Sequence, residues 1–240
     1  MIIIDRLNYY LKRKGAILVG FPNSELKRRK AILNQFKINK VLDVGANVGQ
    51  YAKDIRELNF EGDIISFEPI KHVFNLLEKN QKNDYHSKCE NYALGDFDGE
   101  TQINIAGNSA VSSSILEMLP AHLESAPNSK YIKTEKITVK KLDSIFNLFC
   151  TVKDNVYLKI DAQGFEKNIL EGGEYSLNKI KVLQIELSLM PLYKDSINYL
   201  DMIDFLNSKG FELYGLEPGF SNQITGQLLQ FDGIFVNKNL

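Results

Sequence analysis

The chain has 240 residues, of which 44% are hydrophobic and 25% charged, and its formal net charge is −1. This balance is typical of a globular protein and argues against a dedicated nucleic-acid binder, which needs an excess of positive charge to neutralise phosphates. No apolar run approaches the length of a membrane-spanning helix. Cys89 and Cys150 have no metal-type spacing, so we interpret them as buried thiols and predict a cytoplasmic protein. The composition is compatible with an oligomer.

Residues 1–39 are predicted to form a helical cap on a domain that spans residues 40–240. Basic residues 12–14 precede an apolar stretch over residues 16–21. This stretch is too short for a signal peptide and lacks a cleavage site, so we interpret it as a packed helix, with peripheral membrane attachment as the alternative. Asn23 can cap a further helix that runs from Glu25 to about Phe36.

From residue 40 onward, short apolar strands alternate with helices. Strands are predicted over residues 40–44, 63–67, 88–92, 136–139, 156–160 and 182–187, and helices over residues 49–58, 72–79, 142–149, 165–170 and 197–208. The last of these helices is expected to bury a stripe that includes Leu200 and Leu206. Asp98-Gly99 is expected to be the turn of a hairpin that leads into a strand over residues 101–105. Residues 106–131 show no clean period and are predicted to be a long, lid-like loop.

This order of elements predicts the fold class. Residues 211–216 and 228–236 are expected to pair as an antiparallel hairpin at the carboxyl end of the chain. We therefore predict an α/β fold with a Rossmann-like, mostly parallel sheet, helices on both faces and a C-terminal antiparallel hairpin. Ligands of such sheets bind beyond the carboxyl ends of the strands.

The segment VLDVGANVG, residues 41–49, places a glycine turn between the first strand and its helix, as nucleotide-binding loops do. A dinucleotide loop would need glycine where Asn47 and Gln50 stand, which disfavours a nicotinamide cofactor. A sulfonium nucleoside carries an amino acid instead of a pyrophosphate. Its ammonium is expected to contact Asp43 directly or through water, and its carboxylate the amides of residues 47–49. The cofactor-binding candidates in this segment are Asp43, Gly45, Asn47 and Gly49.

Glu68 follows the second strand, about twenty residues after the glycine turn. At that spacing a carboxylate can accept hydrogen bonds from both ribose hydroxyls. The alternative is an ordinary acidic residue at the start of the following helix.

Asp161 follows the strand over residues 156–160, where it would lie beside the acceptor. A carboxylate that takes or shares the proton of a hydroxyl makes the oxygen a better nucleophile, so we predict Asp161 as catalytic. Its alternative role is to cap the turn into the next helix. Glu186 ends the neighbouring strand and is the second catalytic candidate. We predict no metal site, but a divalent ion held by Asp161 and Glu186 is the alternative.

Six motifs give the sequence a resemblance to the FkbM family of methyltransferases, which has the class I methyltransferase fold. They are DVGANVGQ (43–50), FEP (67–69), NYALGDFDGE (91–100), the serine run (112–114), LKIDAQGFEKNIL (158–170) and GQLLQFDGIFV (226–236). The resemblance implies S-adenosylmethionine as donor and O-methylation of polyketides, sugars, glycans or glycolipids. It adds Ala93 and Leu94 to the cofactor-binding candidates and Ser113 and Ser114 to the substrate-binding ones.

Two residues of the motif over residues 158–170 bear on the site. Such proteins often carry Glu where this chain has Gln163, which weakens any acidic role there. Glu166 is the third substrate-binding candidate, and its alternative role is electrostatic stabilisation of the first helical turn.

We therefore predict an S-adenosylmethionine-dependent O-methyltransferase for a sugar, glycan or small-molecule acceptor, with surface polysaccharide biosynthesis as its setting. The alternatives are a noncatalytic assembly protein with the same fold and a nicotinamide-dependent oxidoreductase. A nucleic-acid methyltransferase would offer an Asn/Asp-Pro-Pro-aromatic turn, whereas residues 161–164 read Asp-Ala-Gln-Gly.

Overall fold

The computed structural model describes residues 23–240. The predicted N-terminal helix over residues 12–21 lies outside the described residues. Helix α2 (Ser24–Gln35) begins where the sequence predicts, because the Asn23 side chain accepts a hydrogen bond of 2.8 Å from the amide of Leu26.

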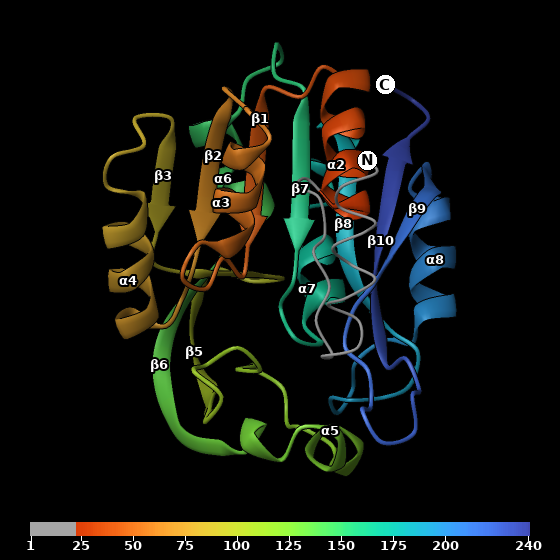
Figure 1. Cartoon of the computed structure of the whole chain (residues 1–240). Coiled ribbons are helices and arrows are strands. Elements are labelled where there is room, and N and C mark those ends of the chain that lie inside the picture. The colour runs from red at the N-terminus through yellow and green to blue at the C-terminus, as the bar shows by residue number, and fades with distance from the viewer. Residues whose placement is uncertain (1–22) are drawn as a thin grey trace, which may run out of the picture.

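Seven strands form the main sheet in the order β3-β2-β1-β7-β8-β10-β9. Their bounds are β1 (Lys40–Val44), β2 (Asp63–Phe67), β3 (Ser87–Glu90), β7 (Val156–Ile160), β8 (Ile180–Ser188), β9 (Phe211–Pro218) and β10 (Gln230–Asn237). The first five strands of this order are parallel. Strand β10 pairs antiparallel with both β8 and β9, so the predicted C-terminal hairpin is confirmed (Figure 1).

Helices cover both faces of the main sheet, which confirms the predicted fold class (Figure 1). The helices that connect its strands are α3 (Gln50–Glu57), α4 (Lys71–Gln81), α6 (Leu142–Phe149), α7 (Glu166–Glu171) and α8 (Tyr199–Ser208). One buried cluster joins α2 and α3 to Val41 and Tyr157. Another joins α6, α7 and α8 to Leu42 and Leu158, which point to the opposite face because side chains alternate along a strand.

A second, three-stranded sheet corrects two predictions. It contains β4 (Ala93–Gly95), β5 (Gly99–Ala106) and β6 (Tyr131–Lys141) in the order β4-β6-β5. The hairpin predicted at Asp98-Gly99 does not form, because β6 lies between β4 and β5 and pairs with both. Residues 136–139, predicted as a strand of the parallel sheet, belong to β6 instead. The second sheet lies beyond the carboxyl ends of β1, β2 and β7 (Figure 1).

The predicted lid, residues 106–131, contains one short helix, α5 (Pro120–Ser125), and the 3₁₀ turn η1 (Pro127–Ser129). Isolated bridges tie it to the body of the protein at Ser114, which pairs with Asn104, and at Met118, which pairs with Tyr193. The lid is therefore an ordered layer over the end of the sheet.

Helix α8 departs from the predicted stripe. Met202 and Leu206 are buried, whereas Leu200 is 57% exposed. With 3.6 residues per turn, positions 202 and 206 share a face and position 200 points away from it.

The face of the main sheet covered by α2 and α3 changes from apolar to polar toward one end. The apolar residues Val41, Ile64, Tyr157 and Val182 are each followed, two positions later, by Asp43, Ser66, Lys159 and Gln184. The strand register places these four polar residues beside one another in a row. All four are buried. Among residues 23–240, no helix has the length and apolar character needed to cross a membrane.

Candidate functional site

A cavity of about 360 Å³ lies at the carboxyl ends of the parallel strands. One wall comes from the main sheet and its turns, through Gly45, Glu68 and Asp161. The opposite wall comes from β5 and the lid, through Ile103 and Ser113. The two sheets therefore enclose one site, in the position that the sequence predicts for a ligand.

The glycine turn brings β1 close to the chain that follows β7. Gly45 lines the cavity and has a φ of +74°, and a Cβ atom there would lie 1.9 Å from the backbone oxygen of Asp161. Only glycine allows this approach. Gly49, also a candidate, has a φ of +92° and precedes α3, but it packs toward Leu77 and does not line the cavity.

The amides of the turn are occupied by the protein itself, which differs from the expectation that they bind a ligand carboxylate. The amide of Asn47 donates to Glu68 Oε2 (3.0 Å), and that of Val48 donates to the Asn47 side chain (2.8 Å). The amide of Gly49 donates to the carbonyl of Ala46 (2.9 Å). A ligand carboxylate would need a partner elsewhere.

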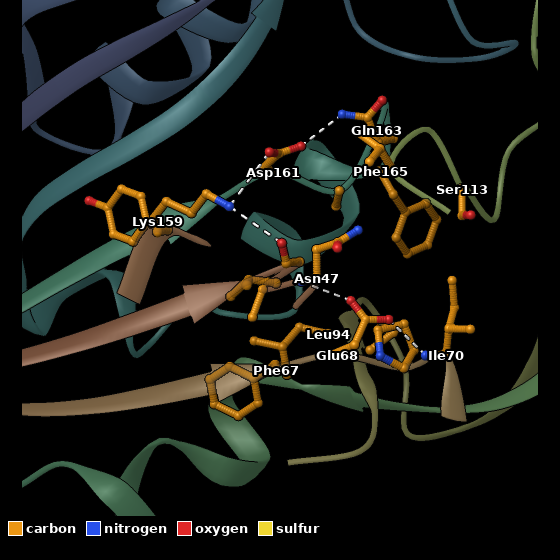
Figure 2. A pocket seen from close by; sticks show the side chains of 18 of the residues that line it. Asn47, Phe67, Glu68, Ile70, Leu94, Ser113, Lys159, Asp161, Gln163 and Phe165 are labelled. Atoms are coloured by element: carbon orange, nitrogen blue, oxygen red, sulfur yellow. Dashed lines mark hydrogen bonds and ion pairs between the residues drawn. The ribbon is translucent and has the colours of Figure 1, made fainter. Parts of the chain in front are cut away.

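Glu68 lines the cavity and is 4% exposed. Its carboxylate also accepts a hydrogen bond from the amide of Ile70 (2.8 Å), so two backbone donors fix its orientation (Figure 2). Burial nevertheless raises the pKa of Glu68 to about 7. Because a carboxylate has about four acceptor positions, two remain for a ligand diol. Ala93 and Leu94 line the wall beside it, together with Ile70. The predicted cofactor residues Glu68, Ala93 and Leu94 therefore lie together.

Asp43 is completely buried and does not line the cavity. Burial raises its pKa, and neither carboxylate oxygen has a hydrogen-bond partner among residues 23–240. Its nearest cation is Lys159, whose Nζ lies 3.4 Å from Oδ1. The expected contact between Asp43 and a ligand ammonium is therefore not available directly, because Asp43 is buried outside the cavity, whereas Lys159, its ion-pair partner, lines the cavity wall.

Lys159 joins the buried polar row to Asp161. Its Nζ lies 3.6 Å from Asp161 Oδ2. Figure 2 draws this ion pair as a dashed line. Burial alone would lower the pKa of Lys159, but Asp161 and Asp43 outweigh it and raise this pKa above its usual value. Lys159 is therefore a cation at neutral pH. Asp161 lines the cavity, and 38% of its side chain is exposed there.

Gln163 connects the two carboxylates predicted to be catalytic. Its amide nitrogen donates to Asp161 Oδ1 (2.8 Å) and to Glu186 Oε2 (3.0 Å), while its oxygen accepts a hydrogen bond from the Tyr193 hydroxyl (2.6 Å). Glu186 accepts a second bond from Gln230 and does not line the cavity. Burial, together with Asp161 and Glu166, raises the pKa of Glu186 well above its usual range.

An amide that bridges two carboxylates fills the position that a divalent ion would need between them. Within residues 23–240 no group of three or more His, Cys, Asp or Glu side chains is arranged to hold a metal ion.

Of the three substrate-binding candidates, two line the cavity and one does not. Glu166 is buried outside the cavity, and its carboxylate accepts hydrogen bonds from the amides of Ala162 (2.9 Å) and Gly164 (3.1 Å). It thus caps the turn that carries Asp161, a role that was not among those predicted for Glu166. Ser113 and Ser114 both line the cavity. The Ser114 hydroxyl donates to the carbonyl of Gln163 (2.7 Å) and so fastens the lid to the same turn.

Sequence reasoning missed three charged residues of the cavity wall, which are Arg29 of α2, Asp54 of α3 and Asp232 of β10. Lys159, which also lines the cavity, was not among the predicted site residues. The available signal was a charged residue inside an apolar strand, as in VYLKI and QFDGIFV. Arg29 had no such signal, because the neighbouring basic residues of α2 made it look like part of a solvated face.

Comparisons with known proteins give one family match and several structures of similar fold. The methyltransferase FkbM domain matches residues 43–213, more than half of the chain. A search of curated proteins finds no match. A candidate O-methyltransferase from Klebsiella pneumoniae is similar in structure, with 13% identity, a TM-score of 0.50, and coverage of 98% of this chain and 90% of that one.

A candidate S-adenosylmethionine-dependent methyltransferase from Listeria monocytogenes is 11% identical and has a TM-score of 0.49. The alignment covers 89% of this chain and 96% of that one. At such identities the likeness concerns the fold alone. The family match rests on the sequence and not on structural similarity, and the matched residues include the glycine turn, Glu68 and Asp161. The chain therefore belongs to the FkbM family of methyltransferases, and S-adenosylmethionine is its methyl donor.

Proposed function

We propose that this methyltransferase transfers the methyl group to a hydroxyl oxygen of a sugar, a glycan or a related small molecule. The observation that carries the proposal is the position of Asp161. Of the two carboxylates predicted to be catalytic, only Asp161 lines the cavity. It is held there between Lys159 and Gln163, so its carboxylate has a fixed orientation toward the space beside the glycine turn.

The residues of the cavity fit an adenosine group. Glu68 offers two free acceptor positions to the ribose hydroxyls, and Ile70 and Leu94 give an apolar wall for the base. Gly45 lets the backbone of Asp161 approach the turn closely, which places Asp161 beside the same space. When bound, S-adenosylmethionine supplies an electrophilic methyl group on a positively charged sulfur.

Asp161 would act on the acceptor. A hydroxyl is a weak nucleophile while it keeps its proton, and a carboxylate that accepts this proton contributes about a hundred- to ten-thousand-fold in rate. Gln163 holds Asp161 Oδ1, and Lys159 lies beside Oδ2, so the side chain is fixed before an acceptor arrives. Because the sulfur loses its positive charge during transfer, a carboxylate aimed at the acceptor rather than at sulfur avoids stabilising the ground state.

The lid wall supports a hydroxylated acceptor. Ser113 Oγ accepts a hydrogen bond from the amide of Ala106 (3.0 Å), so its own proton remains available to donate to a ligand oxygen. Val111 and Ile115 line the same wall and offer apolar contact. Together they form a mixed surface that suits the polar edge and apolar face of a sugar ring.

The experiment supplies donor labelled in its methyl group, together with fractionated polysaccharides and small glycans, and asks which fraction gains label. Alkaline stability of the label then separates a methyl ether from an ester. Label on nitrogen, or on no fraction despite donor binding, would contradict the proposal. The second of these results would favour a noncatalytic role for the fold.

Asp161→Asn tests the assigned residue. We expect kcat to fall by about a hundredfold or more, because the amide cannot accept the proton, while the dissociation constant of the donor changes less than about threefold. Glu186→Gln is the comparison, and we expect a fall below about tenfold because this side chain lies outside the cavity. A larger fall in kcat for Glu186→Gln than for Asp161→Asn would assign the catalytic role to Glu186 instead.

A further inference from the structure

The cavity extends well beyond the part that an adenosine group would fill. Across the sheet its lining runs from Glu68, after β2, through Lys159 of β7 to Asp232 of β10. Neighbouring strands lie about 4.8 Å apart, so β7 is roughly 10 Å from β2, and β10 is roughly another 10 Å away. The end near β10 is the charged one, lined by Arg29, Asp54 and Asp232.

The amino-acid end of the donor needs partners that the glycine turn does not supply. It is a zwitterion, with one carboxylate and one ammonium. The amides of Asn47, Val48 and Gly49 are bonded within the protein, and Asp43 is buried outside the cavity. The partners must therefore come from another part of the wall.

Arg29 has the chemistry and the fixed position to bind a carboxylate. Its Nε and one Nη donate to the same oxygen of Glu217 (3.0 and 2.6 Å), and its guanidinium stacks over the Tyr51 ring with 5.1 Å to the centroid. These contacts orient the planar group and leave further N–H donors free of Glu217. Lys159, the other cation of the wall, already has Asp43 and Asp161 as partners.

Asp232 has the complementary chemistry. Gln184 donates to its Oδ2 (2.8 Å), which fixes the carboxylate, and Tyr51 and Tyr157 in turn donate to the Gln184 oxygen (2.9 and 2.8 Å). Buried hydrogen bonds therefore hold the Asp232 carboxylate on its Oδ2 side, and Asp232 lines the cavity. An ammonium group is a suitable partner for a carboxylate placed in this way.

We propose that Arg29 binds the carboxylate of the donor's amino-acid end and that Asp232 binds its ammonium. This inference rests on the proposed function only in placing the adenosine group beside Glu68. Both residues lie outside residues 43–213, the segment that matches the family. Segments on either side of the family domain therefore complete the donor site, through α2 and β10.

The test compares two ligands that differ in the amino-acid end. S-adenosylhomocysteine has it, and 5′-methylthioadenosine lacks it but keeps the adenosine group. Because Arg29 is the partner of the buried Glu217, Arg29→Gln is combined with Glu217→Gln so that no buried carboxylate loses its cation. Glu217→Gln alone is the matched control, and Arg28→Gln controls for the loss of a cation from α2, since Arg28 does not line the cavity.

Calorimetric titration should show that the double variant binds S-adenosylhomocysteine roughly ten- to a hundredfold more weakly than the unaltered protein, as expected for the loss of one charge-assisted hydrogen bond. Its affinity for 5′-methylthioadenosine should change less than threefold. The two control variants should keep the preference for the longer ligand, and Asp232→Asn should lose it in the same way as the double variant.

Three results would overturn the assignment. In one, the double variant loses affinity for both ligands equally, which would place the effect in the fold. In the second, neither affinity changes. In the third, the unaltered protein binds both ligands equally well. If the unaltered protein binds neither ligand, the donor site itself fails, and that outcome is distinct from the other three.

Discussion

Glu68 combines burial with two backbone hydrogen bonds, and this combination makes donor binding depend on pH. In the folded protein the pKa of Glu68 is about 7, compared with about 4.5 for an unperturbed glutamate. Between these values the folded, ligand-free protein holds a proton that the unfolded chain releases. Glu68 therefore lowers stability as pH rises from about 4.5 to 7. The ionised form is also the one that accepts two ribose hydroxyls.

We therefore expect the affinity for S-adenosylhomocysteine to increase as pH rises through about 7. In Glu68→Gln this increase should disappear, and affinity above pH 7 should fall about tenfold or more, because an amide oxygen accepts more weakly than a carboxylate. Calorimetric titrations from pH 5.5 to 8.5 measure both effects. An unchanged slope in the variant would show that another group controls binding.

Substitutions at Gly45 and Gly226 distinguish the cost of backbone strain from the cost of a steric clash. Both have a φ of +74°, but a Cβ at Gly226 meets nothing within 4 Å, whereas one at Gly45 would meet the Asp161 carbonyl. Gly226→Ala should cost about 1–2 kcal/mol of unfolding free energy from the left-handed conformation alone. Gly45→Ala should cost at least about 2 kcal/mol more and abolish donor binding. Urea denaturation measures the difference, and equal costs would contradict the close approach of the two chains.

At the residue scale, the sequence predicted the residues whose signal is local. The glycine turn, Glu68 and Asp161 each follow a strand, so their place beside the cavity could be inferred from the motif. Asp43, near the end of β1, and Glu166, at the start of α7, stand close to the same strand ends, yet their carboxylates are used inside the protein. Nothing local distinguishes these two groups, because only packing decides whether a side chain after a strand points inward or toward the cavity.

At the scale of elements, residues 106–131 contain a buried histidine. His122 of α5 packs between the rings of Tyr193 and Phe220, with 5.3 Å between centroids in each case. Neither ring nitrogen of His122 has a hydrogen-bond partner among residues 23–240. Burial lowers its pKa below the usual 6.5, so the closed lid keeps His122 neutral. When the lid opens, His122 regains its ordinary pKa and takes up a proton in acid.

The closed lid should therefore be fully stable above about pH 6.5 and lose stability as the pH falls below that value. We expect limited proteolysis within residues 106–131 to be faster at pH 5.5 than at pH 7.5. His122→Phe, which keeps the ring between Tyr193 and Phe220, should remove this difference. His72→Phe, at an exposed position of α4, should keep it. Equal pH dependence in both variants would exclude His122 as the cause.

The same scale shows where sequence patterns fail. The main-sheet strands were predicted well because each is a short apolar run followed by a turn. Strand β6 was not, because its alternating pattern fits an exposed strand equally well in either sheet, and β4 has only three residues. The hairpin at Asp98-Gly99 was a reasonable local interpretation, but β6 inserts from about thirty residues later in the chain and takes the place of the expected partner.

At the scale of the whole molecule, a ligand in the cavity would join the two sheets. The wall contains Gly45 and Glu68 from the main sheet and Ile103 and Ser113 from β5 and the lid. S-adenosylhomocysteine at a hundred times its dissociation constant should stabilise the fold by about 2.7 kcal/mol. For a chain of this size that corresponds to an increase of roughly 5–10 °C in Tm, as one cooperative transition.

Hydrogen exchange should then show slower exchange in the glycine turn and in residues 103–115 together, since the ligand contacts both. Glu68→Ala removes a contact to the ligand and should reduce both effects in parallel. Protection confined to the turn would mean that the lid moves independently of the donor, so that the acceptor and not the donor closes the site. Protection of both segments would instead make donor binding the step that shapes the acceptor wall, because Ser113 and Asp161 can face one substrate only when the two sheets are held together.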